Sequence, residues 1–401
     1  MKNGSILLLT KDAQCKAYYP PYGNQYWKGK MPNYEELANK GTIFNRFYTA
    51  APSSNMSYLS MFSMKYPYEH EIKAYVGLPE DYKGDTLFNI FERKGYENHI
   101  IWDDTWDPDV KYTRCYNTCK IHSIHDLRQG VGCHYEHTEP LKRNEEIAEH
   151  TLSKFREVVE EINSSDKPVF LWCHLPHVLN GRTGYGDDMD LYDKYIGLFR
   201  EYFEDDNIFI SADHGNMNGV KGKVCYGFHV YESNICIPLI TPRIEGLKEC
   251  NKIVCNIDIC KLLIDRVIPQ RDIVISDSSY YAQPKRKTAF VSGRYVYIYN
   301  KFDGSEELYD IEWDPQQNFN LFSEMVYDPD RNTISLSCEY FFYPYWDELP
   351  AIRKKLKSEK ERIWRDAEGT LKMTTKIKGY LSKHQIMKKI LRVVIQYDRW
   401  K

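Results

Sequence analysis

The sequence lacks any apolar run that approaches the roughly 20 residues a helix needs to cross a bilayer. It also lacks the apolar stretch of a secretory signal, because residues 2–5 are polar or small and lead directly into the first strand-like segment. Both absences predict a chain that stays in the cytoplasm. Its 11 cysteines are therefore expected to be free thiols rather than a disulfide framework.

Two apolar segments end in residues that bind metals. Residues 208–212 run directly into Asp213 and His214, and residues 6–10 are followed closely by Asp12. Continuous apolar runs of this length are typical of strands buried on both faces of a parallel sheet. Because parallel strands end at the same edge of the sheet, these carboxylates and the imidazole are placed to hold a divalent metal there.

A turn rich in hydroxyl groups precedes a helical pattern over residues 58–64, and it contains Ser53, Ser54 and Ser57. A hydroxyl at a helix N-terminus meets exposed backbone N–H groups and the positive end of the helix dipole. That environment favours an alkoxide and an anionic substrate. These serines are therefore candidate nucleophiles, and the alternative is that all three only cap the helix.

Histidines end another apolar segment, residues 169–173, which is followed by His174 and His177. At a strand end, an imidazole can bind a substrate oxygen or transfer a proton to a leaving group. For His174 the alternative is a buried histidine whose nitrogens are satisfied within the core.

In this order, the segments resemble the alkaline phosphatase/sulfatase superfamily from about residue 5 to about residue 325. The matching motifs are Asp12, Ser54 ahead of Tyr66-Pro67, Pro176-His177, Asp213-His214-Gly215, His229 with Tyr231-Glu232 ahead of Ile237-Pro238-Leu239-Ile240, and the segments 293–298, 307–315 and 318–321. The resemblance implies an α/β fold in which helices flank a mostly parallel central sheet, as in alkaline phosphatase, with a small C-terminal antiparallel β subdomain.

The resemblance also implies roles for individual residues. It makes Asp12, Ser54, Asp213 and His214 metal ligands, Ser54, His177 and His229 catalytic, and His174, His177 and His229 substrate-binding. One divalent ion is expected. Because imidazole is a poor partner for a hard, oxygen-preferring ion, Mn²⁺ or Zn²⁺ is favoured over Ca²⁺ or Mg²⁺.

One departure from the sulfatase pattern bears on the reaction. Sulfatases carry Pro two residues and Arg four residues after the residue that is oxidised to formylglycine, whereas Met56 and Tyr58 follow Ser54 here. An unmodified serine instead suits phosphoryl transfer, and the pattern looks closest to phosphoglycerol and phosphoethanolamine transferases of the lipoteichoic-acid-synthase type.

The expected function is therefore a phosphoester transferase or hydrolase acting on phospho-substituted glycans or their lipid donors in surface polysaccharide assembly. One alternative is a hydrolase of sulfuric or phosphonate esters. Another is a binding scaffold without activity, which would retain no metal.

The organisation of the chain agrees with an α/β enzyme. Helical patterns over residues 85–95, 142–164 and 187–205 alternate with the apolar strands, which favours a mostly parallel sheet. A further helix is predicted over residues 256–265. We expect a catalytic core over residues 1–270, a small antiparallel subdomain over 271–330 and a basic, largely helical tail over 331–401.

The tail differs in charge from the rest of the chain. Residues 351–401 hold 16 Lys/Arg against five Asp/Glu, in a chain whose net charge is −3. Within it, apolar side chains lie at helical spacing over residues 386–395, as in a helix that lies on an anionic membrane surface. Two interpretations of the tail stay open: peripheral contact with the inner membrane surface, and packing against the acidic core or a second copy in a homo-oligomer. No nucleic acid is expected, because no binding module accompanies the charge.

A cluster of cysteines and histidines lies between Cys115 and His134. It comprises Cys115, Cys119, His122, His125, Cys133 and His134. These residue types can hold a structural zinc ion, although their spacing matches no standard zinc motif.

Overall fold

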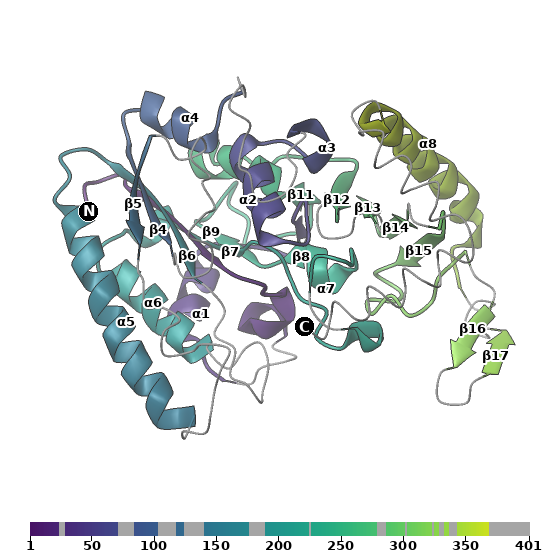
Figure 1. Cartoon of the computed structure of the whole chain (residues 1–401), viewed down its shortest axis with the longest axis horizontal. Helices are drawn as coiled ribbons and strands as arrows, with labels where there is room; N and C mark the ends of the chain where they lie inside the picture. The colour runs from purple at the N-terminus through teal and green to yellow at the C-terminus, as the bar shows by residue number, and fades with distance from the viewer. Residues whose placement is uncertain are drawn as a thin grey trace.

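The computed structural model describes most of the chain. The described residues are 1–23, 29–70, 84–102, 118–123, 140–175, 189–223, 226–278, 286–300, 303–322, 325–328, 333–336 and 343–368. They form a large sheet flanked by helices at one end of the molecule, and a smaller sheet covered by one helix at the other end (Figure 1).

The large sheet has eight strands. From one edge to the other they are β10 (Glu249–Cys250), β2 (Thr42–Phe44), β9 (Leu239–Thr241), β7 (Ile208–Ala212), β1 (Ile6–Lys11), β6 (Val169–Leu175), β4 (Glu97–Trp102) and β5 (Cys119–Ser123). Strand β9 runs antiparallel to both of its neighbours, and the other neighbouring pairs are parallel. The predicted fold class, a mostly parallel sheet, is confirmed.

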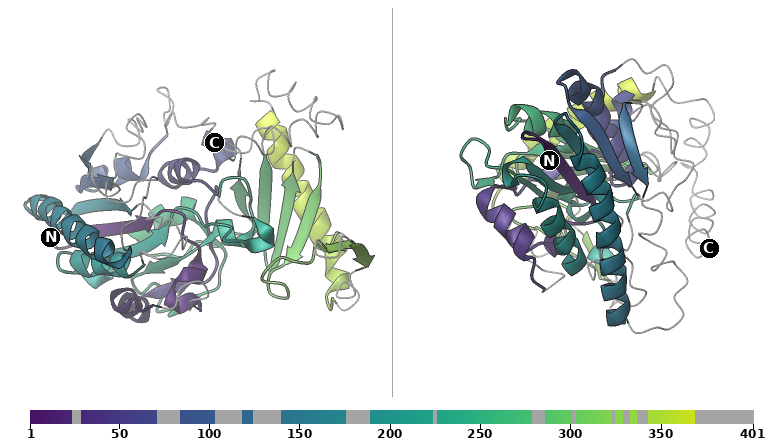
Figure 2. Two further views of the ribbon diagram at one scale, coloured as in Figure 1. Left: turned by 60° about the horizontal axis from the view of Figure 1, so that its bottom comes forward. Right: turned by 90° about the vertical axis from the view of Figure 1, so that its left-hand side faces the viewer.

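The sheet is buried on both faces because its strands are apolar on both faces. In β1, Ile6 and Leu8 pack into one core, and Leu7 and Leu9 pack into the other. Helices α2 (Ser54–Ser63) and α4 (Leu87–Arg93) cover the first face, and α1 (Pro32–Lys40), α5 (Pro140–Asn163) and α6 (Met189–Arg200) cover the second (Figure 2). This layering explains why the strand sequences are continuous apolar runs rather than alternating ones.

Most predicted helices are found, with shifted ends. The helix predicted over residues 85–95 is α4, which begins after a capping box formed by Thr86 and Asn89. The helix predicted over 256–265 is instead a 3₁₀ turn, Asn256–Asp258, followed by a short π-helix, Lys261–Asp265. Its apolar side chains Leu262 and Leu263 still face the core, so periodicity located the buried face but not the type of helix.

Smaller sheets and helices complete the fold. They are the three-stranded sheet β11 (Val254–Cys255), β3 (Phe47–Tyr48) and β8 (Cys236–Ile237); the antiparallel sheet β12 (Val274–Asp277), β13 (Lys287–Ser292), β14 (Tyr295–Asn300) and β15 (Glu306–Asp310); the pair β16 (Met325–Asp328) and β17 (Thr333–Leu336); and helices α3 (Pro67–His70) and α7 (Glu232–Ile235).

The described part of the basic tail packs on the small antiparallel sheet. Helix α8 (Leu349–Glu368) lies against β13 and β14, and buries Leu356 and Ile363. Lys357 pairs with Glu306 at 2.6 Å, so part of the charge is neutralised within the protein. The segment over residues 386–395 lies outside the described residues. None of the described helices is both long enough and apolar enough to cross a membrane.

Candidate active site

Two adjacent parallel strands bring the predicted metal ligands together. Strands β1 and β7 pair with Lys11 opposite Ala212, so Asp12 and Asp213 both follow directly at the same edge of the sheet. The backbone N–H of Ala13 donates to Asp213 Oδ1 at 3.0 Å, which ties the two strand ends to each other. The order of the strands therefore creates the carboxylate pair that the sequence motifs predict.

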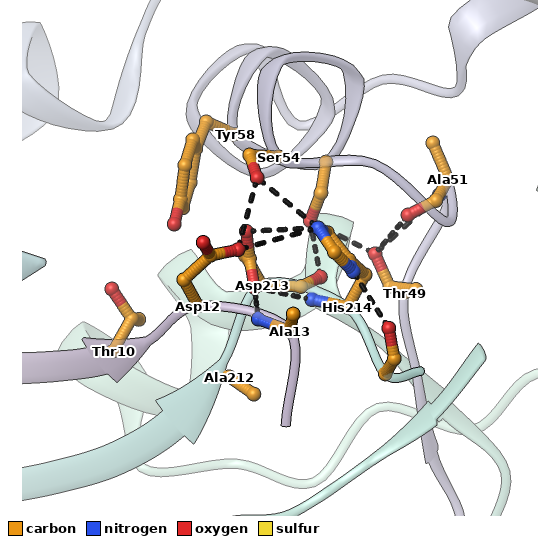
Figure 3. Close-up of polar contacts among 12 residues, drawn as sticks. Thr10, Asp12, Ala13, Thr49, Ala51, Ser54, Tyr58, Ala212, Asp213 and His214 are labelled. Carbon is orange, nitrogen blue, oxygen red and sulfur yellow. Dashed lines mark hydrogen bonds and ion pairs between the residues drawn. The ribbon is translucent and has the colours of Figure 1, made fainter. Parts of the chain in front are cut away.

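Asp12, Asp213 and His214 form a compact buried group (Figure 3). One donor atom from each lies within 4.8 Å of the others. His214 Nε2 is 3.6 Å from Asp12 Oδ1 and 3.4 Å from Asp213 Oδ2. All three side chains are at most 2 % exposed. It is the one group of three or more such residues within the described part of the chain.

The hydrogen bonds of this group leave its inner atoms available to a cation. His214 Nδ1 lies 2.8 Å from the carbonyl oxygen of Gly215 and donates to it, so the lone pair of the neutral imidazole is on Nε2. Asp213 Oδ1 accepts from two backbone N–H groups, and its Oδ2 accepts no hydrogen bond from the described residues. Because a buried carboxylate oxygen is costly to leave unpartnered, the donor set fits a divalent ion.

Burial of this group makes it costly for Asp213 to carry its negative charge. It raises the pKa of Asp213, and the neighbouring Asp12 carboxylate acts in the same direction, whereas His214 lowers this pKa. Two carboxylates held this close in a dry site repel each other. The arrangement therefore stores an electrostatic cost that positive charge would relieve.

Ser54 is the predicted serine that faces this group. It is the first residue of α2, and its Oγ lies 3.3 Å from Asp12 Oδ1 and 3.1 Å from His214 Nε2 (Figure 3). Ser57, one turn later, is fully buried and donates to the carbonyl oxygen of Asp213 at 2.6 Å. Ser53 is the N-cap residue, although its side chain makes no capping hydrogen bond. Because the helix begins at Ser54, the three hydroxyls point in different directions, and Ser54 is the one that contacts Asp12 and His214.

His174 is buried beside this group. It lies opposite Thr10 in the β1–β6 pairing, and its Nδ1 is 3.0 Å from Thr10 Oγ1. The hydroxyl of Tyr58, one turn after Ser54 in α2, lies 2.8 Å from His174 Nε2. Trp172 donates to the same Thr10 hydroxyl at 3.0 Å. Sequence reasoning treated Tyr58 only as the residue in place of the arginine, and its contact with His174 depends on how α2 packs over the sheet.

A second loop, which includes residues 226–230 and precedes α7, also contacts the site. The ring of Tyr226 packs against His214 at a tilt of 38°, with centroids 4.5 Å apart, and Gly227 N donates to the carbonyl oxygen of Pro52 at 2.7 Å. His229 follows in this loop and is 8 % exposed. The nitrogen of Lys287, a residue that no sequence motif singled out, lies 3.4 Å from His229 Nδ1.

Other predicted residues are described only in part. His177 lies outside the described residues, so its role stays a prediction. Of the cysteine and histidine cluster, Cys119 and His122 are described, on β5. His122 Nε2 lies 2.9 Å from Nδ1 of His99 on the neighbouring strand. Zinc at this cluster stays an open alternative.

Gly215 supports the imidazole of His214, and we expect Gly215→Ala to be strongly destabilising. An added Cβ would lie 2.0 Å from the backbone oxygen of Ser233, which cannot move without breaking the bond from Asn216 N. Such overpacking costs about 2 kcal/mol or more, and thermal unfolding measures it.

Gly197→Ala is the control for this substitution, because its Cβ meets a side chain, that of Asn33 at 3.0 Å, rather than a backbone atom at 2.0 Å. Equal melting temperatures for the two variants would contradict the role assigned to Gly215.

Comparison with known proteins places the fold and the motifs in one family. The chain matches the family model described as Sulfatase over residues 7–249. No curated protein matches the chain.

Several solved structures share the fold. BT1596, described as a 2-O GAG sulfatase, is 18 % identical, with 92 % of this chain and 94 % of that chain covered and a TM-score of 0.63. The phosphonate monoester hydrolase of Agrobacterium radiobacter is 13 % identical, with 90 % and 96 % covered and a TM-score of 0.63. BT4656, solved with D-glucosamine-2-N,6-O-disulfate as its substrate, is 15 % identical, with 91 % and 98 % covered and a TM-score of 0.57. With the family match covering more than half of its length, the chain belongs to the sulfatase family, within the alkaline phosphatase/sulfatase superfamily.

Proposed function

We propose that the protein is a metal-dependent phosphoester transferase or hydrolase in which Ser54 is the nucleophile. The observation that carries this proposal is the position of Ser54 Oγ, at the start of α2 and 3.1 Å from His214 Nε2. Asp12, Asp213, His214 and the Ser54 oxygen would hold the ion. When bound, a divalent ion supplies positive charge that lowers the pKa of a neighbouring hydroxyl.

The chain's own residues would then divide the reaction into two steps. Ser54 Oγ gives up its proton to solvent and attacks phosphorus, a bond forms between them, and the bond from phosphorus to the leaving alcohol oxygen breaks. His177 or His229 donates a proton to that oxygen or a hydrogen bond to the non-bridging oxygens. Water or a sugar hydroxyl then attacks the phosphoserine and gives its proton to the histidine that lost one or to solvent, and the bond from phosphorus to Ser54 Oγ breaks as Ser54 regains a proton. Water as acceptor gives hydrolysis and a hydroxyl acceptor gives transfer.

The surroundings of Ser54 support a serine that remains unmodified. Met56 and Tyr58 occupy the positions at which sulfatases carry Pro and Arg, and Tyr58 is fully buried, with its hydroxyl directed at His174. A tyrosine used in this way cannot supply the positive charge of an arginine. The proposal therefore favours phosphoesters, in glycans or lipid-linked donors, over sulfate esters.

A hydrolase of sulfate or phosphonate esters is the second candidate. The names of the similar structures favour it, since they include a 2-O GAG sulfatase and a phosphonate monoester hydrolase. In this alternative Ser54 would be oxidised to formylglycine, which removes two hydrogens from the residue.

Mass spectrometry of the tryptic peptide that contains Ser54 tests the proposal. We expect an unmodified serine in the resting protein, and a phosphorylated Ser54 after brief reaction with a phosphodiester and acid quenching. A peptide lighter by two hydrogens would overturn the proposal in favour of the sulfate ester alternative.

A further inference from the structure

The loop that carries Ser54 is fastened from two sides by segments distant in sequence. Gly227 N donates to the carbonyl oxygen of Pro52 at 2.7 Å, and Asp277 N donates to the carbonyl oxygen of Ala50 at 2.9 Å. The first contact comes from the loop that holds His229, and the second comes from β12 of the small antiparallel sheet. Both segments therefore have a fixed position relative to the nucleophile.

Contacts within the same sheet also hold the start of β13, the strand after β12. The carboxylate of Asp277 pairs with Arg286, whose Nε lies 2.9 Å from Asp277 Oδ1, and both side chains are buried. Beside this pair, Lys287 N donates to Ser278 Oγ at 2.9 Å, and Ser278 N donates to the carbonyl oxygen of Lys287 at 2.9 Å. The backbone of Lys287 is thus held rigidly at the start of β13.

From this position Lys287 reaches His229. Its Nζ lies 3.4 Å from His229 Nδ1. The histidine is itself held, because its carbonyl oxygen accepts from Asn234 Nδ2 at 2.9 Å and its ring stacks on Tyr231 with centroids 6.0 Å apart. An ammonium group has donors and no acceptor. In this contact Nδ1 must therefore accept, which places the proton of a neutral imidazole on Nε2.

We propose that Lys287 is a positioning residue that fixes His229 as a hydrogen-bond donor through Nε2 towards an anionic oxygen of the substrate ester. This inference rests on the proposed function and narrows the role of His229 from proton transfer or oxygen binding to oxygen binding alone. The ammonium group also adds positive charge beside His229. The small antiparallel sheet thereby takes part in substrate binding, through a residue that lies 58 positions from His229 in sequence.

Two pairs of variants test this inference. Lys287→Met removes the donor to Nδ1, and Lys287→Arg keeps a donor and a charge. His229→Gln places an amide N–H near the position of Nε2, and His229→Asn places it near Nδ1. Lys355→Met is the control, because Lys355 on α8 is a lysine that contacts the same strand as Lys287, β13, where it donates to Ser292 Oγ at 2.9 Å.

The readouts are binding of inorganic phosphate by calorimetry, and kcat and KM for a p-nitrophenyl phosphodiester. Lys287→Met should weaken phosphate binding and lower kcat/KM by about tenfold, the effect of one charge-assisted hydrogen bond. Lys287→Arg should recover most of this loss, and Lys355→Met should match the wild type in both readouts. His229→Gln should bind phosphate more tightly than His229→Asn and have the higher kcat/KM. Wild-type values for Lys287→Met, or equal values for the two His229 variants, would overturn the inference.

Phosphate binding by the Ser54→Ala protein separates this inference from the proposed function, because it needs no turnover. If no phosphoester is cleaved but phosphate binding still depends on Lys287, the proposed function fails and the inference stands. If cleavage depends on Ser54 while Lys287→Met changes neither readout, the inference fails and the proposed function stands.

Discussion

Ser54→Ala is expected to lower kcat by at least about 10³-fold, because it removes the atom that forms the covalent bond to phosphorus. The variant should still fold and retain its metal, since three of the four proposed ligands, Asp12, Asp213 and His214, remain. Steady-state turnover of a p-nitrophenyl phosphodiester, with metal content measured on the same samples, tests this expectation.

The neighbouring serines provide matched controls. Ser53→Ala should change kcat less than about tenfold, because the Ser53 side chain makes no capping bond that the change would remove. Ser57→Ala should lower stability, because Thr49 and Asn256 both donate to the Ser57 hydroxyl. If Ser53→Ala or Ser57→Ala abolished turnover while Ser54→Ala did not, Ser54 would not be the nucleophile.

Asp213→Asn is expected to weaken metal binding by at least about 100-fold, because loss of even an outer-shell partner of a metal ligand costs 10–100-fold. The same change should raise the melting temperature of the metal-free protein, because it removes the repulsion between two buried carboxylates. The asparagine keeps an oxygen for the N–H groups of Ala13 and His214, and its N–H₂ group takes the place of Oδ2, which lies 3.4 Å from His214 Nε2, the nitrogen that carries the lone pair.

Thermal unfolding with and without added Mn²⁺ or Zn²⁺ measures both effects. The wild-type protein should gain about 2.7 kcal/mol at a metal concentration 100 times the Kd, and Asp213→Asn should gain little. A metal-free Asp213→Asn protein that melts below the metal-free wild type would contradict the electrostatic cost assigned to this group.

The features that could be predicted from the sequence, the metal-binding group and the fold class, are those encoded in short stretches of neighbouring residues. Asp12 follows one apolar run and Asp213-His214 follows another, and parallel strands bring the ends of both to one edge. Asp12 therefore meets the Asp213-His214 pair across some 200 residues of sequence, as expected. The fold class is confirmed because continuous apolar strands alternating with helices leave few other arrangements. The superfamily rested instead on the resemblance of the motifs, and the family match confirms it.

The sequence alone did not separate the three serines. The pattern predicted a helix from residue 58, whereas α2 begins at Ser54. Because each residue of a helix turns the side chain by about 100°, the direction of each hydroxyl depends on the exact start of the helix. Three-dimensional packing decides that start, since Ser57 is held by Asp213, Thr49 and Asn256.

Contacts between elements that are distant in sequence could not be predicted either. Lys287 lies at the beginning of an ordinary β-strand, and nothing near it in the sequence indicates a partner in a loop 58 residues earlier. Similarly, the replacement of an arginine by Tyr58 was visible in the sequence, whereas its contact with His174 required the packing of α2 on β6.

The most direct measurement of the central claim is metal-dependent turnover of four matched p-nitrophenyl esters, a phosphodiester, a phosphomonoester, a phosphonate and a sulfate, by the wild type and by Ser54→Ala. The account predicts that Mn²⁺ or Zn²⁺ supports cleavage of the phosphoesters and that Ser54→Ala loses this cleavage. Turnover of the sulfate ester alone would contradict the assignment of Ser54 as an unmodified nucleophile for phosphoryl transfer.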